Sequence, residues 1–180
     1  RNQTFTVGTT AFASFDQLAA VSVPSNSTVY VAPGTYSGGT LSVFGLKLLG
    51  ANAYCDWTAT RSAESTINGI LYVNASKIEV NGFAFTGEGR VVANSATNQS
   101  PIYSLKVSYN VFSGSTVARN DNTHLIAIGT RYADGNANAD VSQRRYCDTE
   151  VSHNRFTGSA THLANSIGIM GVFGTTTVTD

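Results

Sequence analysis

"VSYNVFSG" at residues 107–114 and "VSHNRFTG" at residues 151–158 are two versions of one phrase. Each has Val, Ser, Asn, Phe and Gly at the same offsets, and a hydroxyl residue stands before the Gly. The same frame fits "KIEVNGFAFTG" at 77–87 and, more weakly, "LKLLGANA" at 46–53 and "TTTVTD" at 175–180. A phrase that recurs at such intervals indicates stacked structural repeats.

The Val position of this frame falls at residues 48, 80, 107, 151 and 178, with spacings of 32, 27, 44 and 27 residues. A base period near 27 accounts for the spacings if the first and third intervals carry insertions. Polar segments rich in Gly, Asn and Ala at 50–65 and 129–147 supply the extra residues. Their composition is typical of loops.

Within each repeat, apolar and polar residues alternate as in a strand with one buried face. Leu105, Val107 and Phe112 would point inward, whereas Lys106 and Ser108 would point outward. A second apolar piece follows each motif, at 90–93, 124–129 and 166–174. Units of two or three short strands cannot bury their inner faces alone and must stack on their neighbours. The sequence therefore predicts an all-β fold, a β-solenoid of parallel strands.

An asparagine recurs beside the turn of the repeat, as Asn110 and Asn154. Stacked Asn side chains can hydrogen-bond to one another along the axis of a solenoid. The alternative is that both are ordinary turn residues, because Asn tolerates a left-handed backbone. The sequence leaves both interpretations open.

The start of the chain departs from the repeat. Residues 12–24 place Phe15 and Leu18 on one helical face, with Ser14 as the N-cap and Pro24 beyond the end. A terminal coil exposes strand edges, so an amphipathic helix that covers the first coil is physically expected. The sequence therefore predicts an N-terminal capping helix.

We expect a single domain over residues 1–180, with the cap and first coil at 1–38 and the stacked coils at 39–180. Val178 occupies the Val position of a further repeat, so the sequence stops inside a motif. This predicts that the solenoid continues past residue 180 or abuts a partner there, which includes end-to-end self-association.

The composition points to a surface built from uncharged polar residues. Charged residues make up 12% of the 180 residues, against about 25% in ordinary globular domains. Eleven basic and eleven acidic residues give a formal charge of zero, which removes a general attraction to nucleic acid or anionic membrane. No apolar run is long enough to span a bilayer. We therefore expect an extracellular or cell-surface protein with no nucleic-acid partner and no membrane insertion.

The cysteines are Cys55 and Cys147, in "AYCDW" and "RYCDT". Two cysteines this far apart cannot form a structural zinc site by themselves, and they lack the close spacing of a redox pair. A disulfide between them and two buried thiols are both compatible with the sequence. A disulfide would tie the loops at 50–65 and 129–147 into one surface.

The chain resembles the pectate-lyase-like right-handed parallel β-helix superfamily. The residues that carry the likeness span nearly the whole chain: "FASFDQLAAV", "STVYVAPGTYSG", "GLKLLGAN", "VNGFAFTG", "VSYNVFSG" and "VSHNRFTG". The resemblance implies a right-handed parallel β-helix. It does not single out an activity, because the superfamily includes lyases, hydrolases, esterases, phage tailspikes, adhesins and modules without catalysis.

The catalytic signatures that the resemblance would imply are mostly missing. The polygalacturonase pattern of paired aspartates with Gly-His-Gly and Arg-Ile-Lys has no match, and neither do the pectinesterase motifs. Lyases of this superfamily typically use an Arg or Lys base with Ca²⁺ held by acidic residues, and no single segment contains such a cluster. Asp121, Asp134 and Asp140 would supply oxygen ligands to Ca²⁺, but their spacing matches no dedicated loop pattern. We therefore expect no cofactor, with Ca²⁺ as the alternative.

The position before the Val position holds Lys47, Glu79, Lys106, Glu150 and then Thr177. Stacked coils would turn these residues into an outward column of alternating charge, with a spacing of about 4.8 Å. One interpretation is a ladder of ion pairs that fixes the register of the coils. The other is a catalytic Lys106 flanked by acids. His124, close to Arg119 and Asp121, is a second acid–base candidate, whereas His153 in the turn is expected to be structural.

The two loops concentrate the residues that suit a polysaccharide. Arginine side chains bind carboxylates or sulfates, and aromatic rings stack on sugar faces. The alternatives are a solvated loop in which Arg and Asp neutralise one another, and a Trp that anchors its own loop. The candidate binding residues are Trp57, Arg131, Tyr132, Arg145 and Tyr146, and Arg144 is a further catalytic candidate.

These features favour a surface module that recognises or processes polysaccharide, without a motif that demonstrates catalysis. If the protein is an enzyme, we expect a polysaccharide lyase or a glycoside hydrolase. The first alternative is an acidic-polysaccharide lyase that acts by β-elimination with a Lys or Arg base. The second is a purely structural solenoid of an adhesin or phage tail fibre.

Overall fold

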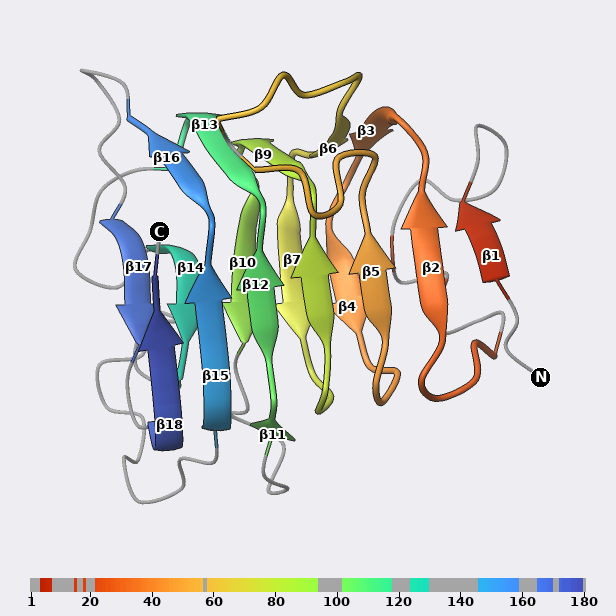
Figure 1. The fold of residues 1–180 in the computed structure, drawn as a ribbon, viewed down its shortest axis with the longest axis vertical. Helices are drawn as coiled ribbons and strands as arrows, with labels where there is room; N and C mark the ends of the chain where they lie inside the picture. The colour runs from red at the N-terminus through yellow and green to blue at the C-terminus, as the bar shows by residue number, and fades with distance from the viewer. Residues whose placement is uncertain are drawn as a thin grey trace.

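The structure is a computed structural model, and its residues form an all-β fold (Figure 1). It describes residues 4–7, 15, 18, 22–56, 58–93, 102–117, 124–129, 146–158, 165–169 and 172–179. Every strand pairing among them is parallel. The prediction of parallel strands in an all-β fold is confirmed.

The strands form three sheets. The first sheet contains β1 (Thr4–Val7), β2 (Thr28–Val31), β5 (Lys47–Leu49), β8 (Glu79–Asn81), β12 (Lys106–Ser108), β15 (Tyr146–Ser152), β11 (Ile102–Tyr103) and β18 (Val172–Val178). The second contains β4 (Gly39–Leu41), β7 (Ile70–Val73), β10 (Arg90–Ala93), β14 (His124–Ile128) and β17 (Asn165–Ile169). The third contains β3 (Gly34–Tyr36), β6 (Ser65–Ile67), β9 (Ala84–Gly87), β13 (Val111–Ser115) and β16 (Arg155–Thr157).

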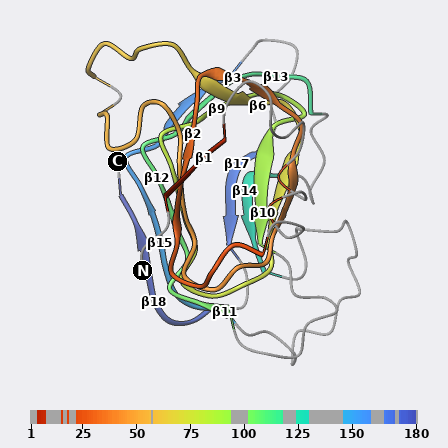
Figure 2. The same ribbon diagram turned by 90° about the vertical axis from the view of Figure 1, so that its right-hand side faces the viewer.

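The chain visits the sheets in a fixed order: first, third, second, and then the first again. Each round of three strands is one coil, and each strand pairs with its counterpart in the next coil. Figure 2 looks along the stack, so that successive coils overlap and the three sheets lie around a common interior. Each repeat predicted from the sequence therefore corresponds to one coil.

The pairing register agrees with the repeat frame. Leu48 pairs with Val80, and Val80 pairs with Val107. Val107 pairs with Val151, which in turn pairs with Val178. The predicted loops are too long at their carboxyl ends, because Ser65 begins β6 and both Tyr146 and Cys147 belong to β15. The predicted column of Val positions is confirmed.

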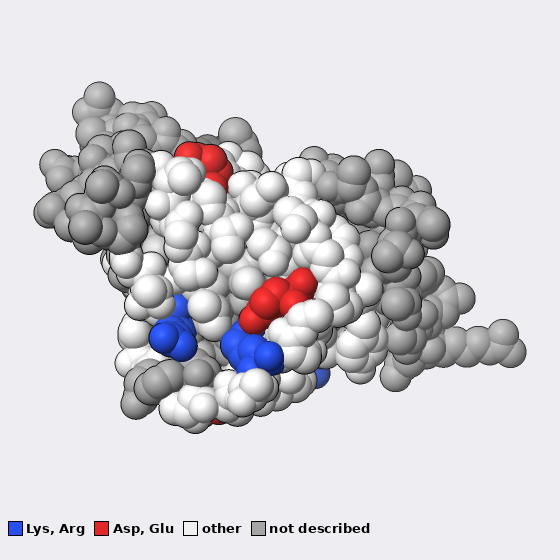
Figure 3. Space-filling view, turned by 90° about the horizontal axis from the view of Figure 1, so that it is seen from above, with Lys and Arg blue, Asp and Glu red and all other residues white. Residues whose placement is uncertain are grey.

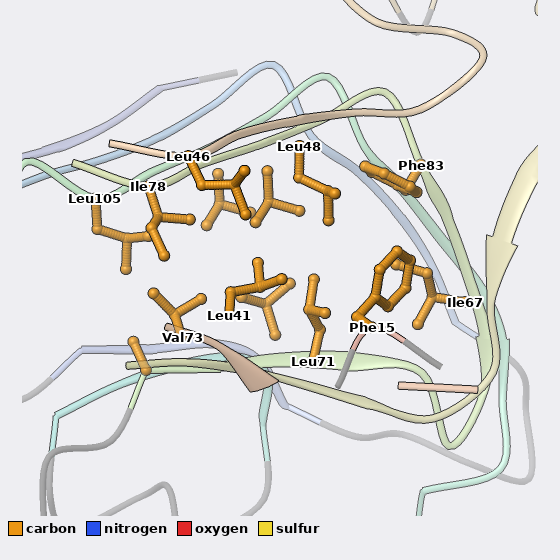
Figure 4. Close-up of a cluster of buried hydrophobic side chains, with 14 of the residues drawn as sticks. Phe15, Leu41, Leu46, Leu48, Ile67, Leu71, Val73, Ile78, Phe83 and Leu105 are labelled. Carbon is orange, nitrogen blue, oxygen red and sulfur yellow. The ribbon is translucent and has the colours of Figure 1, made fainter. Parts of the chain in front are cut away.

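One apolar core lies between the three sheets (Figure 4). Leu48, Val80 and Val107 reach it from the first sheet, and each is completely buried. From the third sheet, the ring of Phe112 stacks between those of Phe85 and Phe156, with centroid distances of 4.6 and 4.9 Å. The repeated Val and Phe of the motif are thus explained by packing.

A ladder of asparagines runs along the turns between the first and third sheets. Asn110 is completely buried, and its Nδ2 donates to Asn154 Oδ1 at 3.1 Å and to the Val80 carbonyl at 3.1 Å. Its Oδ1 accepts the Phe83 N–H at 3.0 Å, and Asn154 Nδ2 donates to the Val107 carbonyl at 2.8 Å. Stacked asparagines along the axis, one of the two sequence interpretations, are therefore present.

The N-terminal segment contributes both a strand and core residues. Strand β1, which the repeat frame did not predict, pairs with β2. Phe15 and Leu18 are buried in the core, and the Leu18 N–H donates to the Phe15 carbonyl at 3.0 Å. The other residues of the helix expected at 12–21 lie outside the described residues, so the capping helix stays a prediction.

Candidate functional site

Most of the candidate binding residues in the loops lie outside the described part of the chain. This applies to Trp57, Arg131, Tyr132, Arg144 and Arg145, and to the candidate Ca²⁺ ligands Asp121, Asp134 and Asp140. Tyr146 is described through its backbone only, at the start of β15. Their predicted roles stay predictions.

Cys55 and Cys147 occupy opposite ends of the first sheet. Cys55 is a half-buried free thiol. It follows Tyr54, whose N–H is bonded to Asn81 at the carboxyl end of β8. Cys147 lies five residues before Ser152, which occupies the corresponding end of β15, and five residues of strand span roughly 16 Å. The structure therefore does not bring the two cysteines together.

Lys106 and His124 are also separated, because they belong to different sheets. Lys106 lies in β12 of the first sheet, with its side chain 37% exposed. His124 begins β14 of the second sheet and is buried, which lowers the pKa of its imidazole. These two candidate catalytic side chains do not form one centre.

The predicted column of alternating charge is present on the outer face of the first sheet. In register, Lys47 pairs with Glu79, Glu79 with Lys106, and Lys106 with Glu150. Lys106 Nζ lies 3.0 Å from Glu150 Oε1, and Ser152 Oγ donates to the same oxygen at 2.6 Å. The hydrogen bond from Ser152, followed by Lys106, lowers the pKa of Glu150. We call Lys47, Glu79, Lys106 and Glu150 the charged column.

The loop that follows β5 is fixed to the coils by a polar network. Arg61 Nε lies 2.7 Å from Glu64 Oε1, and the Arg61 guanidinium donates to the carbonyls of Tyr109 and Phe83. Asn52 Nδ2 donates to Glu64 Oε2 at 2.9 Å. The described part of this insertion is therefore a defined structure that covers the turns of the following coils.

Gly82 lets this loop approach the sheet. Gly82, Tyr109 and His153 occupy equivalent turn positions, and all three have left-handed backbones with φ of 82°, 58° and 54°. A Cβ at Gly82 would collide with the backbone of Ala53. The loop therefore lies directly on the turn at Gly82, which has no side chain. Tyr54 is the residue after Ala53, where this contact is made.

Tyr54, Tyr109 and His153 form a line of rings at these turns, which we call the aromatic row. The Tyr54 and Tyr109 ring centroids are 6.0 Å apart with planes at 68°. Tyr109 stacks on His153, with centroids 4.7 Å apart and planes at 11°. Because coils repeat every 4.8 Å or so, the row extends for about 10 Å along the stack.

Tyr54 is held at two points although its side chain is exposed. Its N–H donates to the buried Asn81 Oδ1 at 2.9 Å and its ring contacts Tyr109, while the Glu79 carboxylate lies near its hydroxyl. Partial burial of the phenol and the nearby Glu79 carboxylate raise the pKa of Tyr54 to about 12. Its φ of 60° is unusual for a bulky residue. Even so, 54% of Tyr54 is exposed.

The aromatic row and the charged column together form the candidate site, which we call the outer patch. The Glu79 carboxylate raises the pKa of the nearby Tyr54, and His153 contributes to the lowered pKa of Glu150. Figure 3 views the molecule from the end where these turns lie, and the described surface there is largely uncharged, with a positive group beside a negative one. The patch therefore offers an exposed ring next to polar groups.

Sequence reasoning assigned Tyr109 and His153 to the turn but did not identify Tyr54. The signal available was indirect: Gly82 stands where other coils have an aromatic residue, and "NAYCDW" at 52–57 is the insertion nearest to it in the chain. The expectation that His153 is structural agrees with its stacking on Tyr109.

The described residues lack both a metal-ligand cluster and a membrane-spanning helix. They contain no cluster of three or more His, Cys, Asp or Glu side chains suited to hold a metal ion. Nor is any described helix long and apolar enough to cross a bilayer.

Comparison of the chain with protein-family models, with curated proteins and with solved structures finds no match in any of the three. The candidate site therefore rests on its own geometry.

Proposed function

We propose that this protein is an extracellular or surface module that binds polysaccharide at the outer patch of a right-handed parallel β-helix. The parallel coils support this fold, and crossover connections between parallel strands are right-handed in about 98% of cases. The fold would be of the pectate-lyase-like kind, with a capping helix over residues 12–21. The low charge of the chain supports an extracellular location.

The main support for the proposal is that Tyr54 is held in place by its neighbours and yet remains exposed. Its backbone and its ring are held by Asn81 and Tyr109, yet 54% of the residue is exposed. A fixed ring binds without losing much conformational entropy. Tyrosine offers an apolar ring and a polar tip, the combination that suits the apolar face and the hydroxyl rim of a sugar.

Polar groups beside the ring suit sugar hydroxyls. A carboxylate has about four acceptor positions and an ammonium has three donors, so the contacts of Glu79 and Lys106 leave further positions free for a ligand. An apolar surface with a few well-placed polar groups is the usual composition of a small-molecule site. Tyr54, Glu79 and Lys106 would therefore be the principal contacts.

The contacts of Lys106 favour binding over β-elimination. A catalytic base must be able to accept a proton from the substrate. The Lys106 Nζ instead lies 3.0 Å from Glu150 Oε1 and is engaged in an ion pair. We therefore propose recognition of a polysaccharide, and the ladder interpretation of the charged column, in place of a lyase built on Lys106.

Binding to a glycan array, followed by titration with the best polymer, tests the proposal. We expect the native chain to bind and Tyr54→Ala to lose most of the affinity. Tyr72→Ala is the matched control, because Tyr72 is 41% exposed but lies on the second sheet, away from the outer patch. Equal binding by the native chain and Tyr54→Ala would refute the site. A silent array would favour the structural-solenoid alternative.

Two further measurements separate the rival interpretations. Absorbance of unsaturated products on uronic-acid polymers, with and without Ca²⁺, is expected to stay flat, and a rise would establish a lyase. Trp57→Ala and Arg144→Ala test the loops that the sequence singled out. If these two variants lose binding while Tyr54→Ala keeps it, the binding site lies in the loops.

A further inference from the structure

The charges of the outer patch decide which polysaccharide it suits. The charged column contains two cations and two anions in alternating order, one coil apart. One of these cations is already paired, because Lys106 Nζ lies 3.0 Å from Glu150 Oε1. The column therefore has no net positive potential that would attract a polyanion. The carboxylates of Glu79 and Glu150 would repel it at close range.

The groups around Tyr54 reinforce this balance. The Glu79 carboxylate lies near the Tyr54 hydroxyl and raises its pKa, and Asp56 is exposed two residues further along the loop. The Arg61 cation, which lies in the same loop, is held by Glu64 and by two backbone carbonyls. The Arg61 fork is therefore not free for the bidentate recognition of a carboxylate or a sulfate, and the exposed Arg155 begins β16 just past His153, at the end of the aromatic row away from Tyr54.

The ring geometry indicates where a sugar would stack. Tyr109 and His153 lie face to face, with planes at 11°, so each covers one face of the other. Tyr54 is tilted by 68° from Tyr109 and retains the largest exposed fraction among the exposed large apolar and aromatic residues, at 54%. Tyr54 is therefore the ring of the row that is most open to a ligand.

We infer that the outer patch binds a neutral glycan, with one sugar ring on Tyr54 and its hydroxyls on Glu79 and Lys106, and discriminates against uronate and sulfated polymers. This inference rests on the proposed function and specifies its ligand class. Neutral sugar hydroxyls both donate and accept hydrogen bonds, so they match a carboxylate and an ammonium that neutralise each other. Binding then depends on contacts and not on long-range attraction.

The test is isothermal titration of the full chain with a panel of neutral, uronate and sulfated polysaccharides at low and high salt. We expect binding to one or more neutral polymers with an affinity that changes less than about twofold with salt, because no net charge is neutralised. Glu79→Gln should weaken it about tenfold, the equivalent of ~1.4 kcal/mol. Glu88→Gln, at an exposed carboxylate in a turn of the third sheet, should leave it unchanged.

The outcomes distinguish this inference from the proposed function. Salt-sensitive binding of uronate or sulfated polymers alone, lost in Tyr54→Ala, would overturn the neutral ligand and leave polysaccharide binding at the outer patch intact. Binding of a neutral polymer that Glu79→Gln and Tyr54→Phe do not weaken would also overturn it, because neither the carboxylate nor the phenol would then contribute. No binding to any polymer would overturn the proposed function itself. Circular dichroism of each variant confirms that it is folded.

Discussion

The ring of Tyr109 stacks on the imidazole of His153, although the two residues are 44 positions apart in the chain. The stack follows from the backbone, because both residues have the same left-handed turn conformation, with φ of 58° and 54°. Equivalent turns one coil apart therefore bring unlike side chains into register. The same geometry aligns Asn110 and Asn154 on the inner side of the turn.

Phe112→Ala tests the aromatic stack in the core. Phe112 is 1% exposed and lies between the rings of Phe85 and Phe156. Its removal should cost about 3 to 5 kcal/mol of the free energy of unfolding, because it leaves a cavity in a packed interior. Denaturant titration measures the change. Tyr72→Ala, at an exposed ring, serves as the control, and equal losses in the two variants would contradict the stacking model.

Asn110→Ala tests the asparagine ladder. The substitution leaves the Phe83 N–H and the Val80 carbonyl without their side-chain partner. Two buried polar groups without partners should cost about 3 kcal/mol of the free energy of unfolding. Asn74→Ala changes an exposed asparagine and should cost far less in the same thermal or denaturant measurement. If the two variants are equally stable, the ladder contributes nothing to folding.

The register of the coils could be predicted from the sequence because burial imposes it. Val107 and Phe112 recur at fixed offsets, since a slip of one residue would turn the apolar face outward. Strand β1 was not predicted, because its four residues do not match the repeat frame. The charged column could be predicted from the register alone. Which neighbours form an ion pair could not, because the pair between Lys106 and Glu150 depends on side-chain conformations.

The candidate site was harder to predict, for a physical reason. Periodicity describes what the coils share, and Tyr54 lies in an insertion that the coils do not share. Its position depends on how the loop folds back over Gly82 and on the bond from its N–H to Asn81. No local pattern encodes these two long-range contacts.

Ser152→Ala should raise the pKa of Glu150. The hydrogen bond from Ser152 is the largest single cause of its lowered pKa, and Lys106 contributes a hydrogen bond and a charge. A lowered carboxyl pKa stabilises the fold above the unfolded value of 4.5, and this stabilisation is lost as the pH falls through the folded value. At this partly exposed site the effect should stay below about 1 kcal/mol. NMR titration of the carboxyl group should give an upward shift for Ser152→Ala, and an unchanged pKa would refute the assignment.

Glu79→Gln should lower the pKa of Tyr54 from its value of about 12. The substitution removes the carboxylate charge that opposes ionisation of the phenol, while the part of the shift that is due to burial remains. Ultraviolet titration of phenolate formation measures the change, and Tyr54→Phe identifies the signal by removing it. Glu88→Gln is the charge-matched control. An unchanged titration in Glu79→Gln would mean that Glu79 does not contact the Tyr54 hydroxyl.

Gly82→Ala tests whether the loop and the aromatic row depend on the missing side chain. The matched control is Gly114→Ala, because both glycines have left-handed backbones, with φ of 82° and 58°, but a Cβ at Gly114 meets nothing within 4 Å. Gly114→Ala should therefore cost only the backbone strain, about 1 to 2 kcal/mol.

At Gly82 the new methyl group would also displace the backbone of Ala53, so the loss should reach about 3 kcal/mol or more of the free energy of unfolding. Because that displacement moves Tyr54 away from Tyr109, Gly82→Ala should also weaken glycan binding, whereas Gly114→Ala should not. Denaturant titration and glycan titration of both variants measure the two effects. Equal stability losses, or full binding by Gly82→Ala, would show that the loop does not rely on contact with this turn.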